Sequence, residues 1–321
     1  MSIFFARFPS PARTPLPGLQ RTDGGLGEAP NIIRETSLSY LGQLAALTAA
    51  FFWRGTAIMF SAAGKRIGAF ATNLLRILCG ALFLCFALWL TTGQFFPIHA
   101  TPYQIKWLAI SGIVGLAIGD AALFVCMVGL GPRIATLLLS LAPAITTLVA
   151  WFFLGEKLNG LSIFGILLTL GGIWWVVLEE HNDPVQGSKT VGLIMGLIAA
   201  IGQGLGIIFA KKALNTDIDA LSATVLRMVP AMAALWLVAL LRGQVLQVLR
   251  TVRDRSAALA TLGGSIFGPF LGVWLANVAV KYTEAGIAAT LLATVPLLII
   301  PLTMVIYRTK PTLRTMIGTL I

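Results

Sequence analysis

The chain has 321 residues, of which 57% are hydrophobic and 11% charged, and its mean hydropathy is +0.89. Soluble globular domains carry about a quarter charged residues, so this composition excludes an ordinary water-soluble fold. The net charge of +11 does not indicate a nucleic-acid partner, because most Lys and Arg residues lie in short gaps between apolar runs.

The first 38 residues differ in composition from the rest. Proline and glycine interrupt them repeatedly, and charges of both signs are present. No apolar run of signal-peptide length follows Arg7, so the segment does not resemble a cleaved leader. We expect residues 1–38 to form a disordered N-terminal tail.

Apolar runs of membrane-spanning length follow the tail. Each is long enough to cross a hydrocarbon core about 30 Å thick as a helix, and too long for a barrel strand. The runs cover residues 40–63, 69–90, 105–130, 133–154, 161–178, 191–210, 220–241, 257–280 and 286–307. We expect Gly131-Pro132-Arg133 to separate the third span from the fourth. A tenth span is expected near Thr312, truncated because the chain ends at Ile321.

The second half of the chain repeats the first. The recurring residues are Gly115 and Gly119 with Gly268 and Gly272, 153 residues later, and Leu75-Arg76 with Leu226-Arg227, 151 residues later. Five spans are an odd number, so the second copy would enter the membrane from the opposite face. The pattern predicts an all-α membrane protein, a ten-helix bundle of two inverted five-helix repeats. The repeats cover 39–180 and 191–321, joined by a linker at 181–190.

Glycine and proline give further expectations for helix packing. Glycines four residues apart let helices approach closely, and we expect them to pack helices within the chain rather than between two chains. These pairs are Gly115/Gly119, Gly192/Gly196, Gly202/Gly206 and Gly268/Gly272. Prolines inside the spans are expected to bend them, namely Pro143, Pro230, Pro269, Pro296 and Pro301.

In order, spacing and duplication, several motifs resemble the drug/metabolite transporter superfamily, in particular proteins with two EamA domains. They are Leu75-Arg76, Leu141-Ala142-Pro143, Leu154-Gly155-Glu156-Lys157, Gly165, Gly171-Gly172, Leu226-Arg227, Val295-Pro296 and Gly318. The resemblance covers residues 40–321. It implies ten helices around a central cavity, and the movement of small metabolites such as amino acids or the export of drugs. One departure is that the Gly-Glu pair at 155–156 is replaced by Arg308-Thr309 in the second half.

The resemblance also implies that both termini lie in the cytoplasm, with the protein in a bacterial inner membrane. The Lys and Arg residues of the loops are divided almost evenly between the two faces under this arrangement. The positive-inside rule therefore does not support it.

Ionisable residues inside spans are costly, so they usually pair or face a cavity. Arg54 and Asp120 are the leading candidates. We hypothesise that both face the central cavity, where Arg54 would attract a substrate carboxylate and Asp120 an ammonium group or a proton. The alternative is a structural Arg54–Asp120 pair.

Two other arginines occupy equivalent places in the halves. Arg76 and Arg227 lie about two turns inside their helices, so we expect them to extend to the interface and to have structural or gating roles. Pro143 and Pro296 are placed in the same class. Glu156 is expected to cap a helix or to pair near Lys157.

Buried amides and tryptophans complete the candidate set. Gln203 and Asn277 either line a polar pocket or cross-link helices. Trp53 and Trp274 fit a cavity wall or core packing equally well. Together with Arg54 and Asp120, these four residues form the predicted substrate-binding set.

The sequence contains none of the motifs that would indicate an enzyme. It has no GxxxxGK[ST] motif and no paired His/Cys cluster, so no ATP site, cofactor or metal is expected. Cys79, Cys85 and Cys126 lie inside apolar runs and read as packing residues.

We therefore expect a secondary transporter of amino-acid-like or drug-like solutes that works by alternating access. Coupling, if any, would be to protons or to the substrate's own gradient. The oligomeric state is not predicted. The alternatives are a non-transporting, degenerate paralogue or scaffold and, less favoured, a membrane enzyme.

Overall fold

The computed structural model describes residues 29–156 and 188–293, with 160, 163–165, 167, 168 and 171 between them. The side chains of 29–36, 54, 57, 58, 61, 128, 131–133 and 136 lie outside the description. Every regular element of the described part is a helix. Six candidate spans are long and apolar enough to cross a membrane: Ala69–Thr92, Pro102–Met127, Leu137–Leu154, Lys189–Leu214, Ala220–Leu241 and Arg255–Tyr282.

This confirms the expected multi-pass helical membrane architecture. The predicted count of ten helices stays a prediction, because most of 161–178 and all of the region near Thr312 lie outside the described residues.

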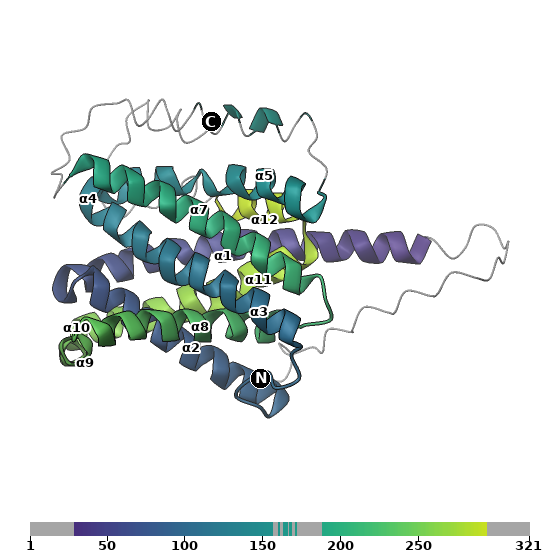
Figure 1. Ribbon diagram of the computed structural model, residues 1–321. Coiled ribbons are helices and arrows are strands. Elements are labelled where there is room, and N and C mark those ends of the chain that lie inside the picture. The colour runs from purple at the N-terminus through teal and green to yellow at the C-terminus, as the bar shows by residue number, and fades with distance from the viewer. Residues whose placement is uncertain are drawn as a thin grey trace.

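Helix α1 covers Ala29–Ile67, and its first turns extend beyond the rest of the bundle (Figure 1). The boundary predicted for a disordered tail at residue 38 is therefore wrong, since residues 29–38 are helical. Pro30 stands in the first turn, where its missing N–H breaks no helical hydrogen bond. Residues 1–28 lie outside the described residues.

After α2 (Ala69–Thr92), which ends at Gly93 with φ +76°, the third crossing has three parts. They are α3 (Pro102–Ser111), a π-helical segment η1 (Gly112–Gly119) and α4 (Asp120–Leu139). Thr101 begins the crossing with a reciprocal capping box to Gln104, so both free N–H groups find an acceptor.

The expected break at Gly131-Pro132-Arg133 is wrong. Helix α4 continues through these residues, and the chain turns at Ser140-Leu141 before α5 (Ala142–Leu154). An unbroken helix is favoured in lipid because it satisfies its backbone polar groups without water. Pro143 consequently stands in the first turn of α5, so the bend expected at this proline is also wrong.

The second half contains α7 (Lys189–Leu214), α8 (Ala220–Leu241) and a short α9 (Val245–Thr251). A three-part crossing follows, composed of α10 (Arg255–Ser265), η2 (Ile266–Gly272) and α11 (Val273–Tyr282). Helix α12 covers Ala285–Leu292. Pro230 and Pro269 lie inside α8 and η2, whereas Pro296 and Pro301 lie outside the described residues.

The two π-helical segments reproduce the sequence repeat in the backbone. Segments η1 and η2 end at Gly119 and Gly272, which are repeat-equivalent residues. Such segments are rare and often lie at functional sites. Their recurrence at equivalent positions indicates that each half keeps a local irregularity in its third crossing.

The first helix of each half packs against the third crossing of the other half (Figure 1). In one pair, Gly192 near the start of α7 lies against Leu130 in the later part of α4. Towards the other end of α7, the Gly206 carbonyl oxygen accepts a hydrogen bond of 2.5 Å from Ser111 Oγ, at the end of α3. In the other pair, α1 with α10–α11, Gly42 in the early part of α1 lies against Tyr282 at the C-terminal end of α11. Both pairs are therefore antiparallel.

Two further antiparallel pairs join the halves. Arg242, directly after α8, lies over the ring of Phe70 at the start of α2, with 5.9 Å from the guanidinium carbon to the ring centroid. Helix α12 packs against α5 and begins where α5 ends, with the Ala285 N–H 3.0 Å from Glu156 Oε1. Equivalent helices thus meet each other across the interface between the halves.

Paired glycines allow the closest of these approaches. A Cβ on Gly202 would lie 2.9 Å from both the Gly119 Cα and the Val114 carbonyl oxygen. A Cβ on Gly206 would lie 3.0 Å from the Gly115 Cα. The interpretation that these glycines pack helices within the chain is confirmed.

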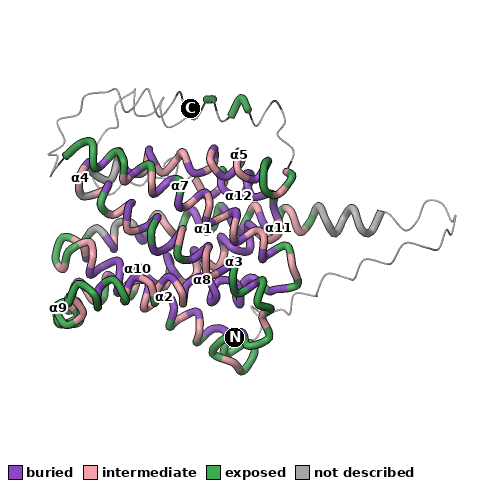
Figure 2. Tube along the Cα trace, in the orientation of Figure 1, coloured by how far each residue is buried: buried purple, intermediate pink, exposed green. Residues whose placement is uncertain are grey.

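Figure 2 shows exposed and buried residues alternating along the helices, and many of the exposed residues have large apolar side chains. They include Leu82, Phe86 and Leu90 of α2, Ile194, Leu197 and Ile201 of α7, and Leu237 and Leu240 of α8. The spacing of three or four residues places each set on one helix face. An apolar surface of this extent is typical of contact with lipid.

Gly202→Ala is expected to destabilise the protein by about 1–3 kcal/mol, because the new methyl group meets backbone atoms that cannot rotate away. Thermal unfolding of the purified protein in detergent measures the effect. Gly55→Ala in α1 is the matched control, since a Cβ there meets no atom within 4 Å. Equal melting temperatures for Gly202→Ala and the wild type would contradict the close glycine contact.

At one end of the bundle, outside the candidate spans, Arg66 Nε donates to Asp254 Oδ2 over 2.8 Å. This hydrogen bond, followed by one from the Ala257 backbone N–H, holds the pKa of Asp254 below its ordinary value. Asp254 also forms the N-cap of α10. The pair therefore links the end of α1 to the start of α10.

Arg66→Gln is expected to raise the pKa of Asp254 towards its ordinary value of about 3.9. Because the pKa of Asp254 is lower in the folded than in the unfolded state, its charged form stabilises the folded state at pH values above the unfolded pKa. This contribution is lost as the pH falls through the folded pKa. In the wild type the loss therefore occurs below about pH 4. Carbon-13 NMR titration of labelled aspartates measures the shift, with Lys65→Gln as the control. An unchanged pKa in Arg66→Gln would show that the ion pair does not form.

Candidate functional site

A buried ion pair lies inside the bundle between α2 and α4. Arg76 Nη2 lies 2.5 Å from Asp120 Oδ2, and the two side chains are only 13% and 11% exposed. Asp120 is the first residue of α4, directly after the π-helical segment η1. The helical irregularity thus ends where the buried carboxylate begins.

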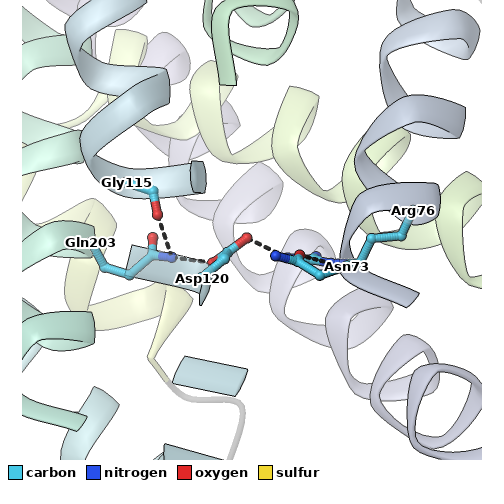
Figure 3. A network of polar contacts seen from close by, with 5 residues as sticks. All are labelled: Asn73, Arg76, Gly115, Asp120 and Gln203. Atoms are coloured by element: carbon cyan, nitrogen blue, oxygen red, sulfur yellow. Dashed lines mark hydrogen bonds and ion pairs between the residues drawn. The ribbon is translucent and has the colours of Figure 1, made fainter. Parts of the chain in front are cut away.

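Neighbouring amides bind further polar atoms of this pair (Figure 3). Arg76 Nε donates to Asn73 Oδ1 over 2.9 Å. Gln203 Nε2 donates to Asp120 Oδ1 over 2.6 Å and to the Gly115 carbonyl oxygen over 3.3 Å. Asp120 therefore lies between α2 of its own half and α7 of the other half. We call Asn73, Arg76, Asp120 and Gln203 the Asp120 network.

A second polar cluster occupies the corresponding helices of the other half. Arg227 is 5% exposed, and its Nη1 donates to Asn277 Oδ1. Asn277 Nδ2 in turn donates to Thr224 Oγ1 over 2.7 Å. We call these three residues the Arg227 cluster. In each half an arginine of the second helix thus has a polar residue three positions before it and a partner on the third crossing.

The two groups meet at the η1 segment. The backbone of Arg227 packs directly on Gly112, and Arg227 Nη2 lies 3.9 Å from where a Cβ on Gly115 would be. The opposite charges of Arg227 and Asp120 are close enough to interact. Among the described residues, the interior therefore combines the guanidinium groups of Arg76 and Arg227 with the carboxylate of Asp120.

The expectation that Arg76 and Arg227 extend to the membrane interface is wrong. Both side chains turn inward to polar partners on neighbouring helices. Asp120 is held by Arg76 and Gln203, and the alternative of an Arg54–Asp120 pair stays a prediction. The Arg54 side chain lies outside the described residues. The roles of these residues in binding or gating stay predictions.

The two candidate tryptophans pack within the bundle. The Trp53 indole lies against Gly272, where the glycine leaves room for it. Trp274 stacks on Phe270, with ring centroids 6.4 Å apart and planes inclined by 13°. These contacts support the core-packing interpretation, and a role for either residue in a cavity wall stays a prediction.

Glu156 caps a helix of the other half. Its Oε1 accepts a hydrogen bond from the Ala285 N–H at the start of α12, 129 residues away, while the expected gating role of Glu156 stays a prediction. Within the second half, Lys211 Nζ donates to the carbonyl oxygens of Val280 and Thr283 at the end of α11, both over 2.7 Å. Pro296, the remaining gating candidate, lies outside the described residues.

A cavity of about 900 Å³ opens among α2, the η1–α4 crossing, α7 and α8. Asn73, Ala117 and Ala121 line it beside the Asp120 network, and Arg242 lines it at the end of α8. Most other lining residues are apolar, including Phe70, Ile113, Phe124, Met195 and Leu235. The cavity is therefore a largely apolar space that borders the Asp120 network at Asn73.

The side chains of this site offer charges and hydrogen-bonding groups. Within the described part of the chain, no three His, Cys, Asp or Glu side chains come together as a set that could hold a metal ion. Sequence reasoning found Asp120 and Gln203 but did not pair Arg76 with Asp120. The sequence did contain one sign that these arginines have polar surroundings. A polar residue stands three positions before each of them, Asn73 before Arg76 and Thr224 before Arg227.

Gln203→Leu is expected to destabilise the protein by about 1–3 kcal/mol, because Asp120 Oδ1 and the Gly115 carbonyl both lose a buried donor. Thermal unfolding in detergent measures the loss. Gln247→Leu on the exposed face of α9 is the matched control. A melting temperature equal to that of the wild type would mean that the amide does not support the carboxylate.

Comparison with known proteins agrees with this architecture. The model of the EamA-like transporter family matches residues 40–178 and 190–321. The uncharacterized protein PA1977 of Pseudomonas aeruginosa is 32% identical over 167 residues, which cover 50% of this chain and 55% of that protein. The chain thus matches about half the length of this relative.

A solved structure described as "Crystal structure of protein" has a similar fold, with a TM-score of 0.66. The match covers 86% of this chain and 93% of the other at 18% identity, so the likeness concerns the fold alone. The family match, in contrast, extends over both halves of the sequence. This multi-pass membrane protein therefore belongs to the EamA-like transporter family, within the drug/metabolite transporter superfamily.

Proposed function

We propose that this protein is a secondary transporter that moves small solutes across the bacterial inner membrane by alternating access between two inverted halves. The observation that carries the proposal is the Asp120 network, in which Gln203 of the second half holds the buried carboxylate of the first. Family membership supports a transport role for small solutes.

The packing of the helices supports the inverted arrangement. In a half with alternating spans, the first and third crossings run in the same direction. Here α1 is antiparallel to α10–α11, and α7 is antiparallel to α3–α4. Two halves with opposite orientation account for both pairs at once, and a transport site at their interface is the usual arrangement in such proteins.

The energetics of the network favour a functional role over a purely structural one. Burying both charges of an ion pair costs desolvation energy that their attraction only partly offsets, so such a pair is a weak source of stability. An ionisable residue inside a membrane bundle more often marks a transport pathway. Because the Asp120 network spans both halves, relative movement of the halves would break and re-form it.

The predicted substrate-binding set divides into two parts in this proposal. Asp120 and Gln203 are assigned to contact with a solute that enters past Asn73 at the cavity wall, and Asn277 acts through the Arg227 cluster. Arg54, Trp53 and Trp274 are assigned to the wall on the α1 side. Arg76 and Arg227 stabilise the two alternative arrangements of the halves. Pro143, Glu156 and Pro296 are assigned as gating positions.

A solute or proton gradient drives the movement in this proposal. The chain contains no phosphate-binding GxxxxGK[ST] motif. Asp120 is the buried acidic residue of the described interior, and it is therefore the position where coupling to protons would act.

Exchanging the charges of Arg76 and Asp120 tests whether the pair does more than hold the bundle together. Arg76→Asp and Asp120→Arg should each lower thermal stability and abolish transport, because each leaves like charges buried together. The double exchange should recover stability but not transport, because the solute would meet the wrong charge. Transport is measured with labelled amino acids and cationic dyes in proteoliposomes, with and without a proton gradient.

The Arg66→Asp plus Asp254→Arg exchange is the control, since it inverts an exposed pair away from the site. It should leave transport close to that of the wild type. Recovery of full transport by the Arg76/Asp120 double exchange would assign the buried pair a structural role only. Absence of any solute movement by the wild type would contradict the transporter proposal itself.

A further inference from the structure

The described interior carries an excess of positive charge. Asp120 is its buried acidic residue, and it already binds Arg76 directly. Arg227 is more deeply buried than Arg76 and has only a neutral amide, Asn277, as its hydrogen-bond partner. Buried charges are normally paired, so this site lacks one negative charge.

Arg227 also has an unused donor. Five buried side-chain polar atoms in the described part of the chain have no hydrogen-bond partner, and Arg227 Nε is the one that belongs to a charged group. A guanidinium presents its donors as a fork that matches a carboxylate. An unpartnered N–H on this fork therefore points to an anionic group that is bound during the working cycle.

The cavity leading to the Asp120 network has matching chemistry. Among the described residues that line it, none is acidic, and Arg242 supplies a cation. Phe70, Phe124 and Leu235 supply apolar walls. An anion with an apolar body fits this combination better than a cation or a strongly polar solute.

We propose that Arg227, together with Arg76, binds the carboxylate of a transported solute whose apolar body occupies the cavity. The inference rests on the proposed transport function and names its substrate class, an apolar monocarboxylate. Asp120 is the internal counter-ion of the empty site. The arriving carboxylate competes with it for the guanidinium groups and supplies the missing negative charge.

This exchange of counter-ions would also connect binding to movement. Asp120 is held to the second half through Gln203, so a solute that displaces Asp120 from Arg76 alters a contact between the halves. Loading and unloading of the site would thereby favour different arrangements of the two halves.

The test compares 3-phenylpropionate with 3-phenylpropionamide, which has the same shape but no charge. Binding to the purified full chain in detergent is followed by tryptophan fluorescence and by thermal shift. The wild type should bind the acid at least about tenfold more tightly than the amide, because charged hydrogen bonds to the buried fork are lost with the amide. Arg227→Gln should abolish this preference.

Matched variants separate a local effect from a general loss of charge or of folding. Arg250→Gln removes the same charge from the exposed face of α9 and should keep the preference for the acid. Arg227→Lys keeps the charge but removes the fork, and should retain a reduced preference. Asp120→Asn removes the competing carboxylate and should bind 3-phenylpropionate more tightly than the wild type.

Equal binding of acid and amide by the wild type would overturn the inference. Retention of the preference in Arg227→Gln, or weaker binding of the acid by Asp120→Asn, would do the same. Proteoliposome flux distinguishes this failure from that of the proposed function. If the protein binds the acid but moves no solute, the proposed transport function is wrong and the carboxylate site stands. If it moves solutes without regard to their charge, the carboxylate site is wrong and the transport function stands.

Discussion

Inside a lipid bilayer, a charged side chain must find its partners within the protein, and the Asp120 carboxylate shows how much of this structure depends on that constraint. Its two oxygens are held by Arg76 from α2 and Gln203 from α7. A glutamine side chain is short, so it reaches Asp120 only because Gly202 and Gly119 let the backbones of α7 and the η1 crossing nearly touch. The close helix packing and the polar network therefore require each other.

The duplication has kept the geometry of the two halves while their chemistry has diverged. Both halves place an arginine on the second helix and a π-helical segment in the third crossing. The partner of the arginine is a carboxylate in the first half, Asp120, and an amide in the second, Asn277. Among the described side chains, this difference leaves the interior with more positive than negative groups. The proposed carboxylate site depends on this asymmetry, which two identical halves would not provide.

Charged side chains make contacts at the helix ends near both rims of the bundle, and some of these contacts join the halves. Glu156 caps α12, Lys211 binds carbonyl groups at the end of α11, and Lys281 Nζ donates to the Ile218 carbonyl oxygen over 2.6 Å. At the opposite rim, Arg66 pairs with Asp254. Glu156 and Lys211 bind backbone groups that helices leave free at their ends. Relative movement of the halves would rearrange the contacts of Glu156 and Arg66, because these two join one half to the other.

The sequence by itself determined the helical membrane class, the two halves and the family. Composition excludes a soluble domain, and a continuous apolar run has to satisfy its backbone internally, which makes it a helix. The residues Leu75-Arg76 and Leu226-Arg227 marked the repeat, and Asp120 and Gln203 were recognisable as costly polar groups inside spans.

The tertiary structure alone decided which of these groups meet. Spacing within a helix identifies neighbours three or four residues apart, such as Asn73 and Arg76, but the partner Asp120 lies 44 residues away on another helix. The same holds for Glu156, whose partner Ala285 is 129 residues distant. The local sequence predicted a turn around Pro132, but the chain turns at Ser140-Leu141 instead, because lipid favours an unbroken helix. Contacts between helices depend on how they rotate and cross, and a linear pattern does not contain that information.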